Sequence, residues 1–213
     1  MDPNSVVEYF IIFLIMCLAV FFLTHIAKSN LGTILKAIRD DDPVLFVEHK
    51  LLYYARRVPT LREKYPSIIC HVPEEEYTIP FGKADIKREG RDVTIVATMM
   101  MVHKALNVAN ELAKQGIEIE VIDPRTLVPL DKQTIINSVK KTGRVVIASE
   151  DCKTGGVAAE ITSIIVEEAF DYLDAPIQRV SALDVPIPYS PILEGIVIPQ
   201  EKNIMDAIKK VIS

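Results

Sequence analysis

The sequence has no tryptophan and only three cysteines, Cys17, Cys70 and Cys152. The cysteines share no C-x-x-C spacing, so they do not form a zinc or iron–sulfur motif and are expected to be isolated, reduced thiols. Reduced thiols are typical of a cytoplasmic protein. The chain also lacks G-x-G-x-x-G and G-K-[ST] segments, which leaves it without a motif for a dinucleotide or a nucleoside triphosphate.

Basic residues are also fewer than acidic ones, 24 against 29, for a formal net charge of −5. The chain has no cluster of Lys and Arg interleaved with aromatic residues, so nucleic acid is not expected as a partner. The hydrophobic share of 49% and the charged share of 25% are typical of a folded protein. A length of 213 residues accommodates one domain and a fragment of a second.

The first 30 residues contain an uncharged apolar run, Tyr9–Thr24, which extends to Ala27 if His25 is tolerated. Residues 9–27 approach the roughly 20 residues that a membrane-spanning helix needs. No Lys or Arg precedes the run, so it does not fit a secretory signal. Three interpretations stay open: a membrane anchor, which would make the protein membrane-associated, a buried core helix, or sequence foreign to the domain that follows.

Residues 31–54 predict one helix and one strand. Apolar residues from Leu31 to Ile38 follow the i, i+3, i+4, i+7 spacing of an amphipathic helix, which Asp40 to Pro43 ends. The short apolar run Val44–Val47 then predicts a buried parallel strand. A single helix–strand unit is not a domain, so it is expected to be a remnant of one. Residues 55–79, with three prolines and an acidic run, predict a linker.

From residue 80 to the C-terminus, strand patterns alternate with helix patterns. We expect Asp131 to begin one helix and Gly143 to end it. Strands separated by helices of this length imply right-handed crossovers, so the predicted class is α/β with a mostly parallel sheet flanked by helices. The predicted strands are 93–97, 117–122, 144–148 and 177–181, and the predicted helices are 103–115, 131–143, 157–172 and 201–212.

Few residues in this region suggest chemistry. Gly155-Gly156 precedes a helix, but a sharp backbone turn explains the pair better than a phosphate site. His49 and His103 lack partners at a motif spacing and are expected to be structural or exposed. Glu150-Asp151 ends a strand where open α/β sheets bind ligands, but adjacent carboxylates point in different directions and do not form an acid–base pair. Met99–Met101 are expected to fill a core or an interface. The residues therefore predict no self-contained active site.

Six segments of the chain are distinctive: IRDDDPVLFVEHKLLY (38–53), VPEEEYTIPFGKADIKREGRDVTIVAT (72–98), EVIDPRTLVPLD (120–131), EDCKTGGVAAEI (150–161), FDYLDAPIQRV (170–180) and DVPIPYSPILE (184–194). Taken in this order, they resemble the β subunit of the thiamine-diphosphate-dependent 2-oxo acid dehydrogenases, a group that includes pyruvate, acetoin and branched-chain enzymes. The resemblance extends from about residue 31 to the C-terminus.

The resemblance implies a transketolase C-terminal-type domain at residues 80–213 and the end of a pyrimidine-binding domain at residues 31–54. It implies the β subunit, or its C-terminal part, of the decarboxylating component of a 2-oxo acid dehydrogenase, with pyruvate dehydrogenase (acetyl-transferring) as the first choice. Such a subunit supports oxidative decarboxylation and lipoyl acylation together with an α subunit and a second β subunit. The alternative is a non-catalytic, membrane-tethered interaction domain that keeps the binding surfaces.

The resemblance also implies thiamine diphosphate and magnesium in the assembled complex. The α subunit holds the diphosphate and the metal, and the family's catalytic glutamate lies in the part of its pyrimidine-binding domain that this chain does not match. We therefore expect no catalytic or cofactor-binding residue in this chain, and no activity from the chain alone.

Two sites carry over from the family by residue. Potassium would bind the backbone oxygens of Ala37, Ile38, Asp40 and Asp42, and a helix end does present free carbonyl groups to a cation. The alternative is an exposed acidic end of the helix.

The second site pairs Asp174 with the C-terminal carboxylate of Ser213. These groups would receive arginines from the subunit-binding domain of the lipoyl acyltransferase core. The alternative for Asp174 is a role in starting a turn. Residues 55–71 depart from the family, in which the connection is short.

Overall fold

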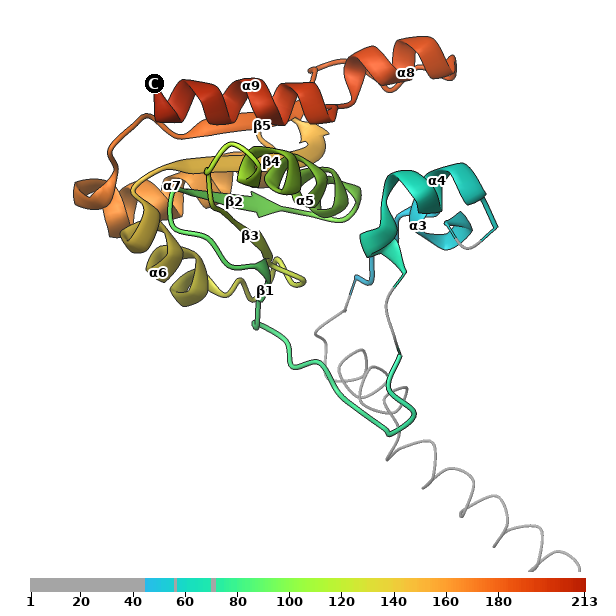
Figure 1. Cartoon of the computed structure of the whole chain (residues 1–213), viewed down its shortest axis with the longest axis horizontal. Coiled ribbons are helices and arrows are strands. Elements are labelled where there is room, and N and C mark those ends of the chain that lie inside the picture. The colour runs from blue at the N-terminus through green and yellow to red at the C-terminus, as the bar shows by residue number, and fades with distance from the viewer. Residues whose placement is uncertain (1–44, 56, 70–71) are drawn as a thin grey trace, which may run out of the picture. The chain divides into compact units, whose positions relative to one another are not determined.

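The computed structural model describes residues 45–55, 57–69 and 72–213 (Figure 1). The chain divides into two compact units, Met1–Val47 and Glu48–Ser213. The predicted apolar segment, and the helix predicted from Leu31 onward, lie outside the described residues. Of the predicted strand Val44–Val47, the last three residues are described, and they are exposed and belong to no strand.

The second unit is built on a five-stranded sheet in the order β1-β3-β2-β4-β5. Strand β1 runs antiparallel to β3, and the other neighbouring strands are parallel, which confirms the predicted α/β class. Every residue of the central strand β2 is buried, as a strand covered on both faces requires. The strands are β1 (Asp85–Arg88), β2 (Val93–Ala97), β3 (Ile119–Asp123), β4 (Val145–Cys152) and β5 (Gln178–Ala182).

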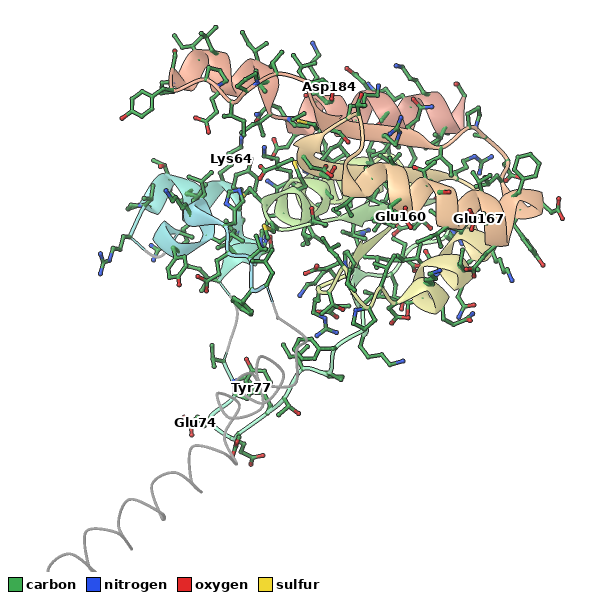
Figure 2. All side chains as sticks on the ribbon, turned by 180° about the vertical axis from the view of Figure 1, so that it is seen from behind. Lys64, Glu74, Tyr77, Glu160, Glu167 and Asp184 are labelled. Atoms are coloured by element: carbon green, nitrogen blue, oxygen red, sulfur yellow. The ribbon has the colours of Figure 1, made fainter. Side chains whose placement is uncertain are left out.

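Two helices cover each face of the sheet. Helices α5 (Met100–Ala113) and α9 (Glu201–Ile212) pack on one face, and helices α6 (Lys132–Thr142) and α7 (Val157–Ala169) pack on the other. Alternate residues of β2 point to opposite layers, since Ile95 belongs to the α5–α9 core and Val96 to the α6–α7 core. Figure 2 shows Glu160 and Glu167 on the outer, exposed side of α7.

Local sequence explains where the helices begin and end. The Asp131 side chain accepts a hydrogen bond from the Thr134 amide, 3.2 Å away, and Gly143 closes α6 in the left-handed conformation, so both predicted ends are confirmed. At the start of α9, the side chains of Gln200 and Asn203 form a reciprocal capping box.

Several elements differ from their predicted bounds. Helix α5 begins at Met100 rather than His103, so Met100 and Met101 are core residues. The predicted helix 157–172 ends at Ala169 and continues as a short 3₁₀ turn, η2 (Phe170–Tyr172). Strand β1 and helix α8 (Pro191–Val197) were not expected, because β1 contains one apolar residue and α8 follows a proline-rich stretch.

The segment before the sheet contains helix α3 (Lys50–Tyr54), helix α4 (Pro59–Lys64) and the 3₁₀ turn η1 (Pro66–Ile68). Two of the prolines that suggested a linker instead begin α4 and η1, where a missing N–H is harmless. Residues 72–84 contain no helix or strand. None of the described helices is long and apolar enough to cross a membrane, and residues 9–27 are outside the described part.

Candidate functional site

Charged side chains from three segments meet at the carboxyl edge of the sheet, the edge at which the parallel strands end. Glu150, near the end of β4, accepts a hydrogen bond on Oε2 from His49 Nε2 at 2.6 Å. Its other oxygen lies 3.9 Å from Lys104 Nζ on α5. We call His49, His103, Lys104 and Glu150 the carboxyl-edge cluster. It joins residues that are 101 positions apart in the sequence.

Lys104 is the most buried member of the cluster, with only 6% of its surface exposed. Its ammonium group donates a hydrogen bond to the backbone oxygen of Pro199 at 2.7 Å. Burial lowers the pKa of Lys104 below its ordinary value, although the carboxylate of Glu150 acts in the opposite direction. Lys104 therefore links α5 to the loop between α8 and α9.

His103 is held as a neutral imidazole. Its Nδ1 atom is hydrogen-bonded to the Ser67 hydroxyl at 2.9 Å. Burial lowers the pKa of His103 to about 4, with smaller contributions from the positive charges of Lys87 and His49. At neutral pH the cluster therefore contains a neutral His103.

Asp151, the neighbour of Glu150, points elsewhere. Its carboxylate accepts hydrogen bonds from the Ser149 hydroxyl and from the Val157 amide at the start of α7. A Cβ atom on Gly156 would lie only 2.3 Å from this carboxylate and equally close to the Cys152 oxygen. The structure thus confirms that the two carboxylates diverge, and it explains Gly156 as a position where the backbone passes close to Asp151.

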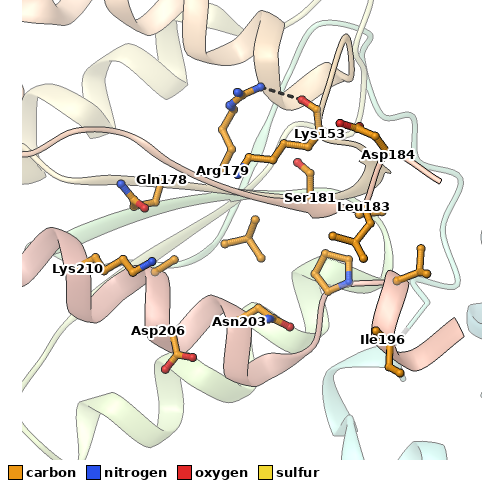
Figure 3. Close-up of a pocket in the computed structure, with 15 residues that line it drawn as sticks. Lys153, Gln178, Arg179, Ser181, Leu183, Asp184, Ile196, Asn203, Asp206 and Lys210 are labelled. Carbon is orange, nitrogen blue, oxygen red and sulfur yellow. Dashed lines mark hydrogen bonds between the residues drawn. The ribbon is translucent and has the colours of Figure 1, made fainter. Parts of the chain in front are cut away.

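A groove lies beside the edge strand β5 and is lined by residues of β5, α8 and α9, with a volume of about 390 Å³ (Figure 3). Arg179 donates a hydrogen bond to the Lys153 backbone oxygen at 2.9 Å, and the Asp184 carboxylate receives the amide and hydroxyl of Thr154. Hydrogen bonds from Thr154 lower the pKa of Asp184. These contacts hold the loops after β4 and β5 together.

Asp174 and Ser213 lie at the opposite, amino edge of the sheet. The Asp174 amide donates to the Gly143 oxygen at 2.7 Å, just before β4 begins, and Ser213 ends the helix that runs back along β5 (Figure 1). The Asp174 side chain is 63% exposed and its Oδ2 atom lies 4.0 Å from Arg144 Nη1. The fold therefore brings both predicted partner-binding residues to one edge and leaves them exposed.

Comparison with known proteins gives the family. The model of the transketolase C-terminal domain matches residues 82–204, which is more than half of the chain. The chain belongs to the transketolase C-terminal domain family.

Its similarity to β subunits of 2-oxo acid dehydrogenases is also confirmed. The chain is 48% identical over 185 residues to the pyruvate dehydrogenase E1 component subunit beta of Rickettsia felis, covering 87% of this chain and 53% of that protein. It is 43% identical over 179 residues to the acetoin:2,6-dichlorophenolindophenol oxidoreductase subunit beta of Cupriavidus necator, covering 84% of this chain and 49% of that protein. The chain thus spans about half the length of the curated relatives it matches.

A solved structure described as a split-gene transketolase, inactive beta4 tetramer, has the same fold, with a TM-score of 0.57 and 28% sequence identity. The match covers 68% of this chain and 46% of that one. Nothing in these comparisons favours the alternative of a non-catalytic, membrane-tethered domain.

As a transketolase C-terminal domain, the described part does not fit a diphosphate cofactor at the start of α7. The amino end of a helix normally attracts an anion, but here the Asp151 carboxylate already occupies that position. A second anion would meet its negative charge. The predicted potassium ligands Ala37, Ile38, Asp40 and Asp42 lie outside the described residues. Within the described ranges, no group of three His, Cys, Asp or Glu side chains gathers as metal ligands do.

Sequence reasoning missed the carboxyl-edge cluster. His49 and His103 were expected to be structural or exposed, because their partners lie far away in the sequence. Lys104 carried a signal that was overlooked: it lies on the same face of α5 as the buried Val108 and Leu112, at i+4 and i+8. A lysine within an apolar stripe is expected to have a buried partner.

Proposed function

We propose that this chain is the C-terminal part of the β subunit of the decarboxylating component of a 2-oxo acid dehydrogenase complex. Pyruvate is the first choice of substrate, in oxidative decarboxylation followed by acylation of a lipoyl group. The observation that carries the proposal is the 48% identity to a pyruvate dehydrogenase β subunit over 87% of the chain. Such a degree of identity supports a shared role, whereas the fold alone would not.

The proposed contribution of this domain is to bind partner subunits rather than to hold the cofactor. Thiamine diphosphate and magnesium would be bound in the assembled complex, with the α subunit supplying the diphosphate and metal ligands. This division of labour agrees with the Asp151 carboxylate at the start of α7, which leaves no place for a diphosphate there. A potassium ion at the backbone oxygens of Ala37, Ile38, Asp40 and Asp42 belongs to the same proposal.

Three partners are proposed: an α subunit, a second β subunit and the subunit-binding domain of the lipoyl acyltransferase core. A neighbour of known structure is described as a beta4 tetramer, which supports contact between β chains. For the core, the exposed Asp174 and the carboxylate of Ser213 would pair with arginine side chains, which bind carboxylates in a two-pronged geometry.

Association with an α subunit tests the proposal directly. The full chain, co-expressed with the 2-oxo acid dehydrogenase α subunit of the same organism, is expected to elute with it as one complex in size-exclusion chromatography. Calorimetric titration of thiamine diphosphate and Mg²⁺ into the chain alone should give no heat of binding. Separate elution of the two proteins, or micromolar binding by the chain alone, would contradict the proposed role.

A further inference from the structure

The segment before the sheet is attached to the domain through a small number of polar contacts. We call its described residues, 48–55 and 57–69, the strap; it carries α3, α4 and η1. His49 binds Glu150 at 2.6 Å, and Ser67 binds His103 at 2.9 Å. The backbone oxygen of Lys64 accepts a hydrogen bond from the Asn107 side chain at 2.8 Å.

Helix α5 provides most of this docking surface. His103 and Asn107 are one helical turn apart, at i and i+4, so they present their side chains on the same face. Asn107 also donates to Glu201 at the start of α9, and Glu201 lies 3.8 Å from the Lys64 ammonium group. The strap is therefore bound along one line, from the end of β4 across α5 to α9.

Little apolar burial supports these contacts within the helical parts of the strap. Neither α4 nor η1 contains a buried residue, and Tyr65, between them, is the large side chain that is buried there. A segment held by few apolar contacts and by partly exposed hydrogen bonds opens more easily than the core on which it rests. The sheet, by contrast, has a complete apolar core on both faces.

Charged groups that are largely sheltered from water lie beneath the strap. Lys104 is nearly fully buried, and the Lys64 ammonium of the strap and the Glu201 carboxylate are among the charges that act on it. His103 is buried enough to stay neutral at pH 7. Removal of the strap would give water access to a cation, an imidazole and the Glu150 carboxylate at the edge where open α/β sheets bind ligands.

We propose that the strap is a lid that opens locally over the carboxyl edge while the sheet stays folded, and that the His49–Glu150 contact is its latch. Glu150 is the only cluster member that contacts both the strap and Lys104 among the described residues, at 2.6 and 3.9 Å. Loss of its charge weakens the closed state without touching the apolar core. The open state exposes Lys104 and His103 together.

Limited trypsin digestion of the full chain at pH 7.5 measures this opening, because Arg62 and Lys64 are cleavage sites within α4. Cleavage of a briefly opened segment follows the population of the open form. In Glu150→Gln, cleavage at these two sites is expected to be about ten times faster than in the unchanged chain, as loss of one charge-assisted hydrogen bond implies. The control is Glu111→Gln, which removes an exposed carboxylate from α5, the helix that contacts the strap through His103 and Asn107; its cleavage rate is expected to be unchanged.

Hydrogen exchange distinguishes a lid from general unfolding. Amides of α4 should exchange faster in Glu150→Gln, while those of the buried strand β2 keep their protection. If Glu150→Gln does not fold, His49→Ala, which removes the imidazole that donates to Glu150, tests the same latch. Equal cleavage in Glu150→Gln and Glu111→Gln, or faster exchange throughout β2, would overturn the proposal.

Discussion

The carboxyl-edge cluster and Asp174 at the amino edge differ in how far their charged side chains are buried and bound within the chain. At the carboxyl edge, Lys104, Glu150 and Asp151 bind other groups of the same chain, and Lys104 is almost fully buried. At the amino edge, the Asp174 side chain is 63% exposed and lies 4.0 Å from Arg144. Buried charges must be satisfied internally and so hold the structure together, whereas exposed ones are free to recognise a partner.

Glycines show the same difference. A Cβ atom on Gly156 would approach a backbone oxygen and a carboxylate that is already bound to the start of α7. A Cβ atom on Gly143 would mainly approach the exposed side chain of Asp174, at 2.5 Å, which can turn away. The carboxyl edge is therefore the less tolerant of the two, and each variant below tests that contrast.

The largest effect is expected from Gly156→Ala. Its φ of −78° suits any residue, so the whole cost comes from collision with Asp151 and the Cys152 oxygen. We expect the free energy of unfolding to fall by about 3 kcal/mol, the upper part of the range for overpacked sites. Urea unfolding followed by circular dichroism measures the change.

The control at the amino edge is Gly143→Ala, where the left-handed φ of 67° is the main cost. A decrease of about 1–2 kcal/mol is expected from that conformation. If Gly143→Ala proved the more damaging of the pair, the amino edge would be the rigid one and the contrast would be reversed.

Lys104→Met should be next in magnitude. Methionine fills similar space, but it leaves the Pro199 oxygen without its donor and removes the ammonium group 3.9 Å from Glu150. An unsatisfied buried acceptor costs about 1–3 kcal/mol. Thermal and urea unfolding should both show the loss, and Lys209→Met on the exposed side of α9 should change stability by less than about 0.5 kcal/mol. If the stability of Lys104→Met equalled that of the unchanged chain, a water molecule would have to donate to the Pro199 oxygen in place of the lysine.

Acid should weaken the carboxyl edge before the amino edge. The pKa of His103 is lowered from 6.5 to about 4 in the folded state, mainly by burial. Above pH 6.5 the folded and unfolded states are both neutral at this residue. Between pH 6.5 and 4 the unfolded state binds a proton that the folded state does not, so stability falls as the pH falls. Urea unfolding at pH 7, 5.5 and 4.5 should show this loss in the unchanged chain and a smaller one in His103→Gln.

Glu120, at the start of β3, is expected to affect stability at lower pH than His103 does. Burial alone would raise its pKa, but hydrogen bonds from Lys141 and Ser138 outweigh burial and lower it below 4.5. Its stabilising contribution is complete above pH 4.5 and is lost only as the pH falls further. Glu120→Gln should therefore change the stability profile below pH 4.5, not between 6.5 and 5. A difference in stability between Glu120→Gln and the unchanged chain that develops near pH 6 would contradict the assignment.

Apolar spacing and capping residues in the sequence predict most of this fold. The features that they do not predict depend on contacts between residues far apart in the sequence. The apolar run of β2 and the ends of α6 at Asp131 and Gly143 follow from burial and capping, which act within a few residues. Strand β1 was missed because Ile86 is its one apolar residue and an edge strand needs no more. The Lys104–Pro199 contact spans 95 residues, a separation at which the sequence contains no periodic signal.

The smallest effect on stability, and the largest on recognition, is expected from Asp174→Asn. Its carboxylate is 63% exposed and 4.0 Å from Arg144, so its removal should change the free energy of unfolding by less than about 0.5 kcal/mol. Binding to the subunit-binding domain of the acyltransferase core should nevertheless weaken about tenfold, since a charged partner of arginine is lost.

The matched control is Asp171→Asn, which changes an exposed residue of η2 and should bind as the unchanged chain does. Surface plasmon resonance at two salt concentrations separates the cases, because an ionic contact weakens further as salt rises. Equal affinity for the two variants would remove Asp174 from the interface and leave its exposed charge as a feature of the turn before β5.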